Sequence, residues 1–79
     1  MITHAEIDNR LKELTGLQHG WDGYGAEPIS DATIAACCVV ARALVDIGRH
    51  ISITPTSTET LEIGWMEGDL DCIAEINAV

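Results

Sequence analysis

Basic residues are scarce in this chain. Only four Lys and Arg residues stand against thirteen Asp and Glu residues, which gives a net charge of −9. All four bases lie in residues 1–49, whereas residues 50–79 carry six acids and no Lys or Arg. Proteins that bind DNA or RNA directly use Lys and Arg to neutralise phosphates. The composition therefore argues against direct nucleic-acid binding. It leaves two interpretations open, a partner protein with a basic surface and an acidic surface that only keeps the protein in solution.

Long apolar runs and paired cysteines are also missing. No apolar run approaches the ~20 residues that span a bilayer, and the first residues lack the basic and apolar regions of a signal peptide. The chain has three cysteines, of which Cys37 and Cys38 are adjacent, so they do not form a disulfide framework. We expect a single cytoplasmic domain over residues 1–79, without membrane association.

Two segments have the period of a helix. The first is expected at residues 4–15, where Thr3 and Glu6 fit a capping box and Ile7, Leu11 and Leu14 form one apolar stripe.

The second helix is expected at residues 32–47, with Ser30 as its N-cap and Gly48 at its end. It is apolar around almost its whole circumference, which is typical of a buried helix. We expect it to lie across a sheet, with the first helix or a second subunit covering part of its back.

After Gly48 the apolar period changes from 3.6 to 2. Three strands are expected, one around residues 51–55, one at 61–66 and one at 70–76, joined by short turns. The chain is thus predicted to be an α+β protein of two layers, with two helices followed by a three-stranded antiparallel meander, ααβββ. The face toward the second helix is expected to carry Leu61, Ile63, Trp65, Leu70, Cys72 and Ile76.

The outer face of this sheet is the first candidate binding site. Carboxylates on neighbouring strands and at the hairpin would form a dense anionic surface that suits a basic groove on another protein. A solvated face with two tolerated apolar residues is the competing interpretation. The predicted partner-binding residues are Glu62, Glu67, Asp69, Asp71 and Glu75 for charge, with Met66 and Ile73 for apolar contact.

The segment HGWDGYGAEPIS, residues 19–30, is the second candidate. Its glycines permit backbone conformations that a Cβ forbids, so it can simply fix the crossing between the helices, with Trp21 and Tyr24 as a lid. Alternatively, Trp21 and Tyr24 form a patch for a partner, as exposed aromatic residues often do. The segment lacks the third Gly of a dinucleotide fingerprint and the Lys of a phosphate-binding loop.

Residues for catalysis or for a cofactor are not grouped in the sequence. His4, His19, His50 and the cysteines show no zinc-ligand spacing, and no nucleophile motif joins Ser, His and Asp. We therefore expect no catalytic residues, no metal and no cofactor, and a protein that is not an enzyme.

The motifs W-D-G-Y-G-A-x-P-I-S and T-P-T, followed by L-E-I-G-W, resemble those of a group of small, uncharacterised bacterial and phage proteins. The resemblance covers roughly residues 14–76, and the first motif is the specific one. Where that group has P-D-G-G before the strand, this chain has Ser57-Thr58-Glu59-Thr60. The resemblance transfers no catalytic residue, but it implies a phage or mobile-element setting, in which small acidic proteins such as anti-CRISPR proteins inhibit host machinery.

Two hypotheses for function follow. The first is a non-enzymatic acidic protein that inhibits a host nucleic-acid-handling complex, of the CRISPR-like defence type, by occupying its basic groove. The second is an antitoxin-like or accessory protein that acts as a homodimer, or sequesters a partner protein, through Trp21, Tyr24 and the back of the second helix.

Overall fold

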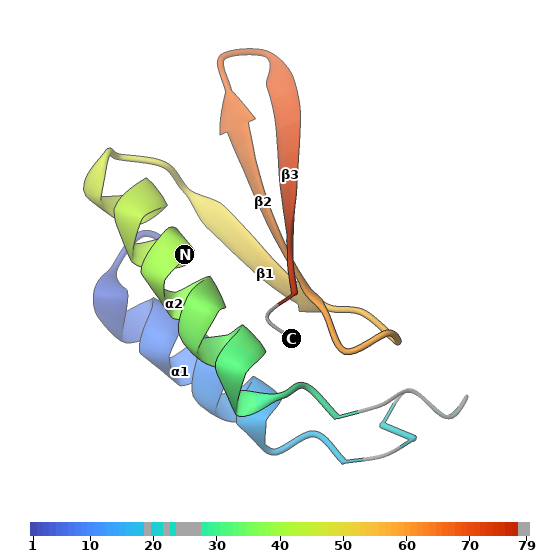
Figure 1. Ribbon diagram of the computed structural model, residues 1–79. Helices are drawn as coiled ribbons and strands as arrows, with labels where there is room; N and C mark the ends of the chain where they lie inside the picture. Colours follow the sequence, from blue (N-terminus) through green and yellow to red (C-terminus); the bar gives the residue numbers. More distant parts are fainter. Residues whose placement is uncertain (19, 22, 24–27, 78–79) are drawn as a thin grey trace.

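The computed structural model describes residues 1–18, 20, 21, 23 and 28–77 and has two layers, one of helices and one of strands (Figure 1). The strands form one antiparallel sheet in the order β1-β2-β3. This confirms the predicted ααβββ architecture. The elements are α1 (His4–Thr15), α2 (Asp31–Asp46), β1 (Ile51–Pro55), β2 (Leu61–Glu67) and β3 (Leu70–Ile76).

The helix ends follow the capping signals in the sequence. The Thr3 and Ser30 side chains each accept a hydrogen bond of 3.2 Å from the backbone N–H three residues on, at the starts of α1 and α2. Beyond α2, Gly48 has a φ of 86°, and the N–H of Arg49 donates to the carbonyl of Leu44 over 2.9 Å. This is a Schellman motif, which stops the helix and turns the chain into β1.

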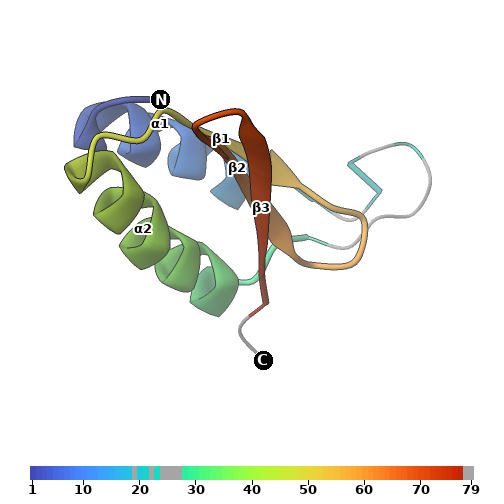
Figure 2. The same ribbon diagram turned by 90° about the horizontal axis from the view of Figure 1, so that it is seen from above.

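The core lies between α2 and the sheet, with α1 packed beside α2 (Figure 2). The expected stripe of α1 is buried, and so are Ile51 and Ile53 on β1, whereas the inward Trp65 on β2 is only half-buried. Leu61 and Ile63 on the central strand are fully buried. The buried apolar residues that form the core are Ile7, Leu11, Leu14, Ile29, Cys37, Ala41, Ile51, Ile53, Leu61 and Ile63.

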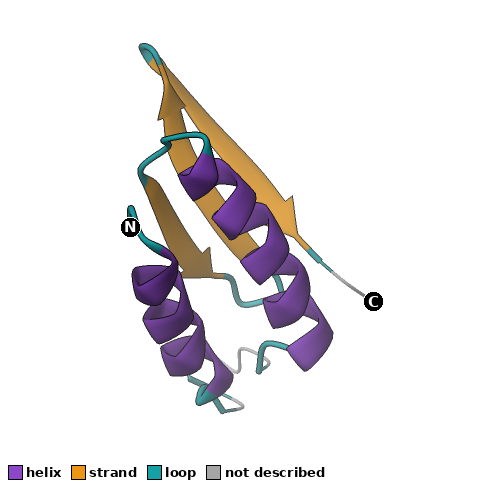
Figure 3. Ribbon diagram, turned by 90° about the vertical axis from the view of Figure 1, so that its left-hand side faces the viewer, coloured by secondary structure: helices purple, strands orange, loops and turns teal. Residues whose placement is uncertain are grey.

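The strand register divides the sheet into two faces. Ile53, Ile63 and Ala74 lie in one row across the sheet and face the helices. Since side chains alternate along a strand, Glu62 and Gly64 face the other way. The two-layer arrangement leaves this outer face uncovered by α1 or α2 (Figure 3).

One core residue is predicted wrongly. Leu70 has the parity of the helix-facing row, because it lies opposite Glu67, but its side chain is 70% exposed. The β2–β3 hairpin extends beyond the end of the helical layer (Figure 1), so no helix covers its tip. Strand alternation predicts which face of the sheet a side chain lies on. It does not predict how much of that face the helices cover.

The turn between β1 and β2 contains a backbone conformation that is unfavourable for its residue. Glu59 has a φ of 65°, the left-handed region, which costs a residue with a Cβ about 1–2 kcal/mol. The turn is nevertheless held by a hydrogen bond of 2.9 Å from the Thr56 N–H to the Thr60 carbonyl, and by contact between their hydroxyl groups.

Replacing Leu61 by Ala should lower the free energy of unfolding by about 2–5 kcal/mol, because it leaves a cavity in the core. Leu70→Ala removes the same atoms from an exposed site and should change the free energy of unfolding by less than about 0.5 kcal/mol. Urea unfolding followed by circular dichroism measures both. Equal losses for the two variants would contradict the placement of Leu70.

Glu59→Gly should raise the free energy of unfolding by about 1 kcal/mol, because glycine adopts a positive φ without steric cost. Thermal unfolding of the variant beside the parent protein measures the change. Thr58→Gly, at the neighbouring turn position without a positive φ, is the matched control and should not stabilise the protein. A destabilised Glu59→Gly variant would show that the Glu59 side chain contributes more than its backbone costs.

Candidate functional site

The outer face of the sheet brings together three of the predicted carboxylates. Glu62 on β2 lies directly opposite Glu75 on β3, and Asp71 lies opposite Met66. Side chains directly opposite on neighbouring strands have Cβ atoms about 4.5–5.5 Å apart, and like charges in such a pair are destabilising. The outer face therefore concentrates negative charge at an electrostatic cost to the fold.

The arginines lie elsewhere and have partners of their own. Arg42 on α2 forms an ion pair of 2.7 Å with Asp8 on α1, and Arg10 pairs with Glu13 at 3.1 Å. Among the described residues, no Lys or Arg side chain forms an ion pair with a carboxylate of the outer face. The negative charge of this face is therefore not balanced from within the sheet.

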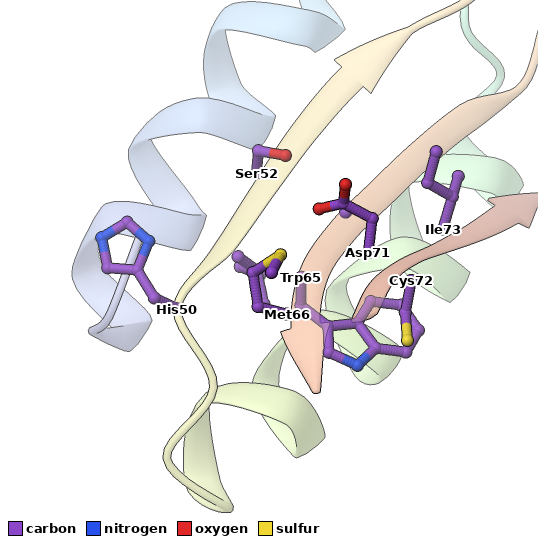
Figure 4. Close-up of a pocket in the computed structure, with 9 residues that line it drawn as sticks. His50, Ser52, Trp65, Met66, Asp71, Cys72 and Ile73 are labelled. Carbon is purple, nitrogen blue, oxygen red and sulfur yellow. The ribbon is translucent and has the colours of Figure 1, made fainter. Parts of the chain in front are cut away.

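The two predicted apolar contact residues lie on the same face. Met66 is 49% exposed and Ile73 is 69% exposed. Between β1 and β3 the face is hollowed, with a volume of about 370 Å³ bordered by Ser52, Gly64 and Ile73 (Figure 4). The hollow exists because Gly64, in the middle of β2, has no side chain to fill the space between its neighbours Ser52 and Ile73.

Sequence reasoning missed the hollow. The signal for it was Gly64, since a glycine inside a strand often marks a place where another chain or ligand can approach closely. A Cβ at this position would lie 3.0 Å from the Ser52 hydroxyl. His50 also lines the hollow, at the end next to Met66.

Glu67 does not belong to this face, which corrects its predicted place. Its register puts it in the row that faces the helices. There its carboxylate accepts two hydrogen bonds from the Arg49 guanidinium, of which Nη2–Oε2 is 2.9 Å, and one of 3.0 Å from the Trp65 indole N–H. The hydrogen bonds from Arg49 hold the pKa of Glu67 below its usual range.

Asp69 also lies apart from the three carboxylates. It occupies the two-residue loop Gly68–Asp69, where Gly68 has a φ of 60°, the pattern of a type II′ hairpin turn. Asp69 is exposed at the tip of the hairpin and adds negative charge at one end of the sheet.

The aromatic segment is described only in part. Tyr24 and Asp22 lie outside the described residues. Gly20 and Gly23 have φ values of 77° and 81°, and the N–H of Trp21 donates to the Gln18 carbonyl over 3.0 Å. The described part therefore turns as the glycines predict, with Trp21 half-buried.

The cysteines and histidines of the described residues do not gather into a metal-binding group, since no three of His, Cys, Asp or Glu come together there. All three cysteines are free thiols. Cys37 is buried in the core, and burial raises its pKa to about 11. In the same described part of the chain, no helix has the length and hydropathy to cross a bilayer.

No protein-family model matches the sequence, and no curated protein or solved structure is significantly similar to it.

Glu67→Gln should lower the melting temperature at neutral pH, because it removes the charged partner of Arg49. A depressed pKa means that the ion pair stabilises the fold above the unfolded pKa, near 4.5, and is lost as pH falls through the lower folded pKa. The difference between variant and parent should therefore disappear in acid.

Thermal unfolding between pH 2 and pH 8 measures this difference. Glu75→Gln is the matched control, because it makes the same change where a like charge is the neighbour. It should not lower the melting temperature at neutral pH. A pH-independent effect of Glu67→Gln would show that the carboxylate acts through packing and not through its charge.

Proposed function

We propose that this protein is a non-enzymatic inhibitor of phage or mobile-element type, acting in the cytoplasm of a bacterial host. Its acidic sheet face occupies the basic groove of a nucleic-acid-handling complex, of the CRISPR-like defence class. The observation that carries the proposal is the outer face itself, which holds Glu62, Asp71 and Glu75 and on which no Lys or Arg of the described residues forms an ion pair. The resemblance of the W-D-G-Y-G-A segment to small phage proteins supports the setting.

The electrostatics of the face support a cationic partner. The Glu62–Glu75 pair is unfavourable in the free protein, and a Lys or Arg side chain between the two carboxylates would turn that repulsion into attraction. A groove that normally holds nucleic acid offers such side chains in a row. Met66 and Ile73 then contribute apolar area next to the charges, and the hollow over Gly64 admits a side chain of the partner.

A second candidate function rests on α2. Ala35, Val39, Ala43 and Ile47 recur every four residues and are all exposed, with Val39 at 71%. This stripe is an apolar surface that neither α1 nor the sheet covers. It favours the antitoxin-like or accessory function, in which α2 meets a second copy or a partner protein.

Reversing Glu62 and Glu75 together to Lys should weaken binding of the host complex at least tenfold, because it turns the directly opposed carboxylate pair of the proposed interface into two cations. Affinity capture from nuclease-treated bacterial lysate identifies the complex, and surface plasmon resonance measures the loss. Circular dichroism checks that the variant is folded.

Two variants make the result specific. Glu13→Lys with Asp46→Lys changes the net charge equally on the helical layer and should leave binding within about twofold. Val39→Glu tests the α2 stripe. Binding that survives the sheet variant but is lost with Val39→Glu would replace the inhibitor proposal by the accessory one.

A further inference from the structure

The two edges of the sheet differ, and the β1 edge is closed. The Ile51 N–H donates to the Met1 carbonyl over 3.0 Å, and the Met1 ammonium donates to the Ile51 carbonyl over 2.7 Å. Beside them the Ile53 carbonyl accepts a hydrogen bond of 3.0 Å from Arg10 Nε. Pro55, at the end of the strand, has no N–H to offer. A further strand therefore cannot pair along β1.

The hydrogen-bonding phase of β1 sets that of β3. In an antiparallel sheet the backbone groups of successive residues point alternately to one neighbour and the other. The backbone N–H and C=O groups of Ile51 and Ile53 point outward at the β1 edge, so those of Ser52, between them, point to β2. On β2 the backbone groups of Gly64, opposite Ser52, therefore point to β1, and those of Ile63 point to β3. The register is continuous, so the residues of β3 that turn their N–H and C=O groups outward are Asp71, Ile73 and Glu75.

The β3 edge is open over the part of the chain that the structure describes. No described residue forms a backbone or side-chain hydrogen bond to it, and β3 lies at the side of the sheet away from α1 (Figure 3). The strand is seven residues long, without a bulge or a proline. An edge of this kind is a template on which an extended segment can pair.

The side chains along this edge specify what can pair there. On the outer face Asp71 and Glu75 flank the exposed Ile73, and their backbone positions are about 13 Å apart, four residues of a strand. On the helix-facing side, Cys72 and Ala74 are half-buried and can receive small apolar side chains. The complementary strand thus has two cations four positions apart and apolar residues between them.

A second copy of this chain does not meet that requirement. If two β3 strands paired antiparallel about Ile73, Asp71 of each would lie directly opposite Glu75 of the other. Such like-charge pairs are destabilising. The carboxylates act against self-pairing, as charges on edge strands commonly do, and they select a basic segment.

We propose that β3 takes up an extended segment of a basic partner protein as a fourth strand, in which two Lys or Arg residues four positions apart flank a central apolar residue. This inference rests on the proposed function, because it specifies which part of the basic partner is bound. Backbone hydrogen bonds to β3 orient the partner segment, while Asp71 and Glu75 select a segment with Lys or Arg at the matching positions.

A synthetic peptide tests the proposal without knowledge of the partner. The probe is the acetylated and amidated peptide Thr-Lys-Val-Val-Val-Lys-Thr, whose lysines face the two carboxylates when its central Val lies opposite Ile73. We expect binding by calorimetry and at least tenfold slower amide hydrogen exchange at Asp71, Ile73 and Glu75. The same peptide with Glu in place of Lys is the control and should bind at least tenfold more weakly.

Ile73→Pro removes the outward N–H at the centre of the edge without removing a hydrogen bond to β2, as prolines on edge strands do. It should weaken peptide binding at least tenfold. Undiminished binding, or equal binding of the acidic peptide, would overturn the proposal. If the variant does not fold, the exchange measurement on the unaltered protein decides alone, since unchanged exchange at the three amides overturns strand addition.

The failure of this inference can be told apart from failure of the proposed function. A captured host complex that is lost with Glu62→Lys and Glu75→Lys but retained with Ile73→Pro keeps the inhibitor proposal and overturns strand addition. A complex retained by the charge-reversed protein overturns the inhibitor proposal itself. A dimer in light scattering that disappears with Ile73→Pro would assign the edge to a second copy instead.

Discussion

The register of β2 between its two neighbours is the constraint on which the rest of the molecule depends. It sets Leu61 and Ile63 into the core and, by the same alternation, sets Glu62 on the opposite face. A shift of one residue would exchange the two faces and place a carboxylate in the core. The burial of these two aliphatic side chains thereby holds Glu62 opposite Glu75, although two like charges in this position repel each other. The acidic face is maintained by the core beneath it.

The charges of the protein are separated by the same two layers. The ion pairs of Arg10, Arg42 and Arg49 lie within α1, between α2 and α1, and between the loop after α2 and β2. Glu67 is the one carboxylate of the sheet that joins this set, because its parity turns it toward Arg49. The two helices carry bases as well as acids, whereas the three strands carry acids and no Lys or Arg. A cationic surface therefore meets carboxylates without neighbouring cations of the same layer on the sheet.

Sequence periodicity predicted the elements, the helix caps and the membership of Glu62, Asp71, Glu75, Met66 and Ile73 in one face. It did not predict the exposure of Leu70, because alternation carries no information on where the helical layer ends. It misplaced Glu67 for a related reason. The sequence did not show whether Glu67 is the last residue of the strand or the first residue of the turn, so strand alternation could not be used to assign its face. The hollow over Gly64 depends on three strands at once and is visible only when their register is known. The role of the face as a binding site stays a prediction.

Arg49 marks a boundary with a biochemical consequence. It is the last Lys or Arg in the chain, and it stands at the junction of the two layers, with its guanidinium held by Glu67 and by the Ile47 carbonyl. A protease such as trypsin, which cuts after Lys or Arg, therefore has every one of its sites at or before this junction. Digestion can divide the helices into fragments, but it leaves all three strands on a single peptide that begins at His50.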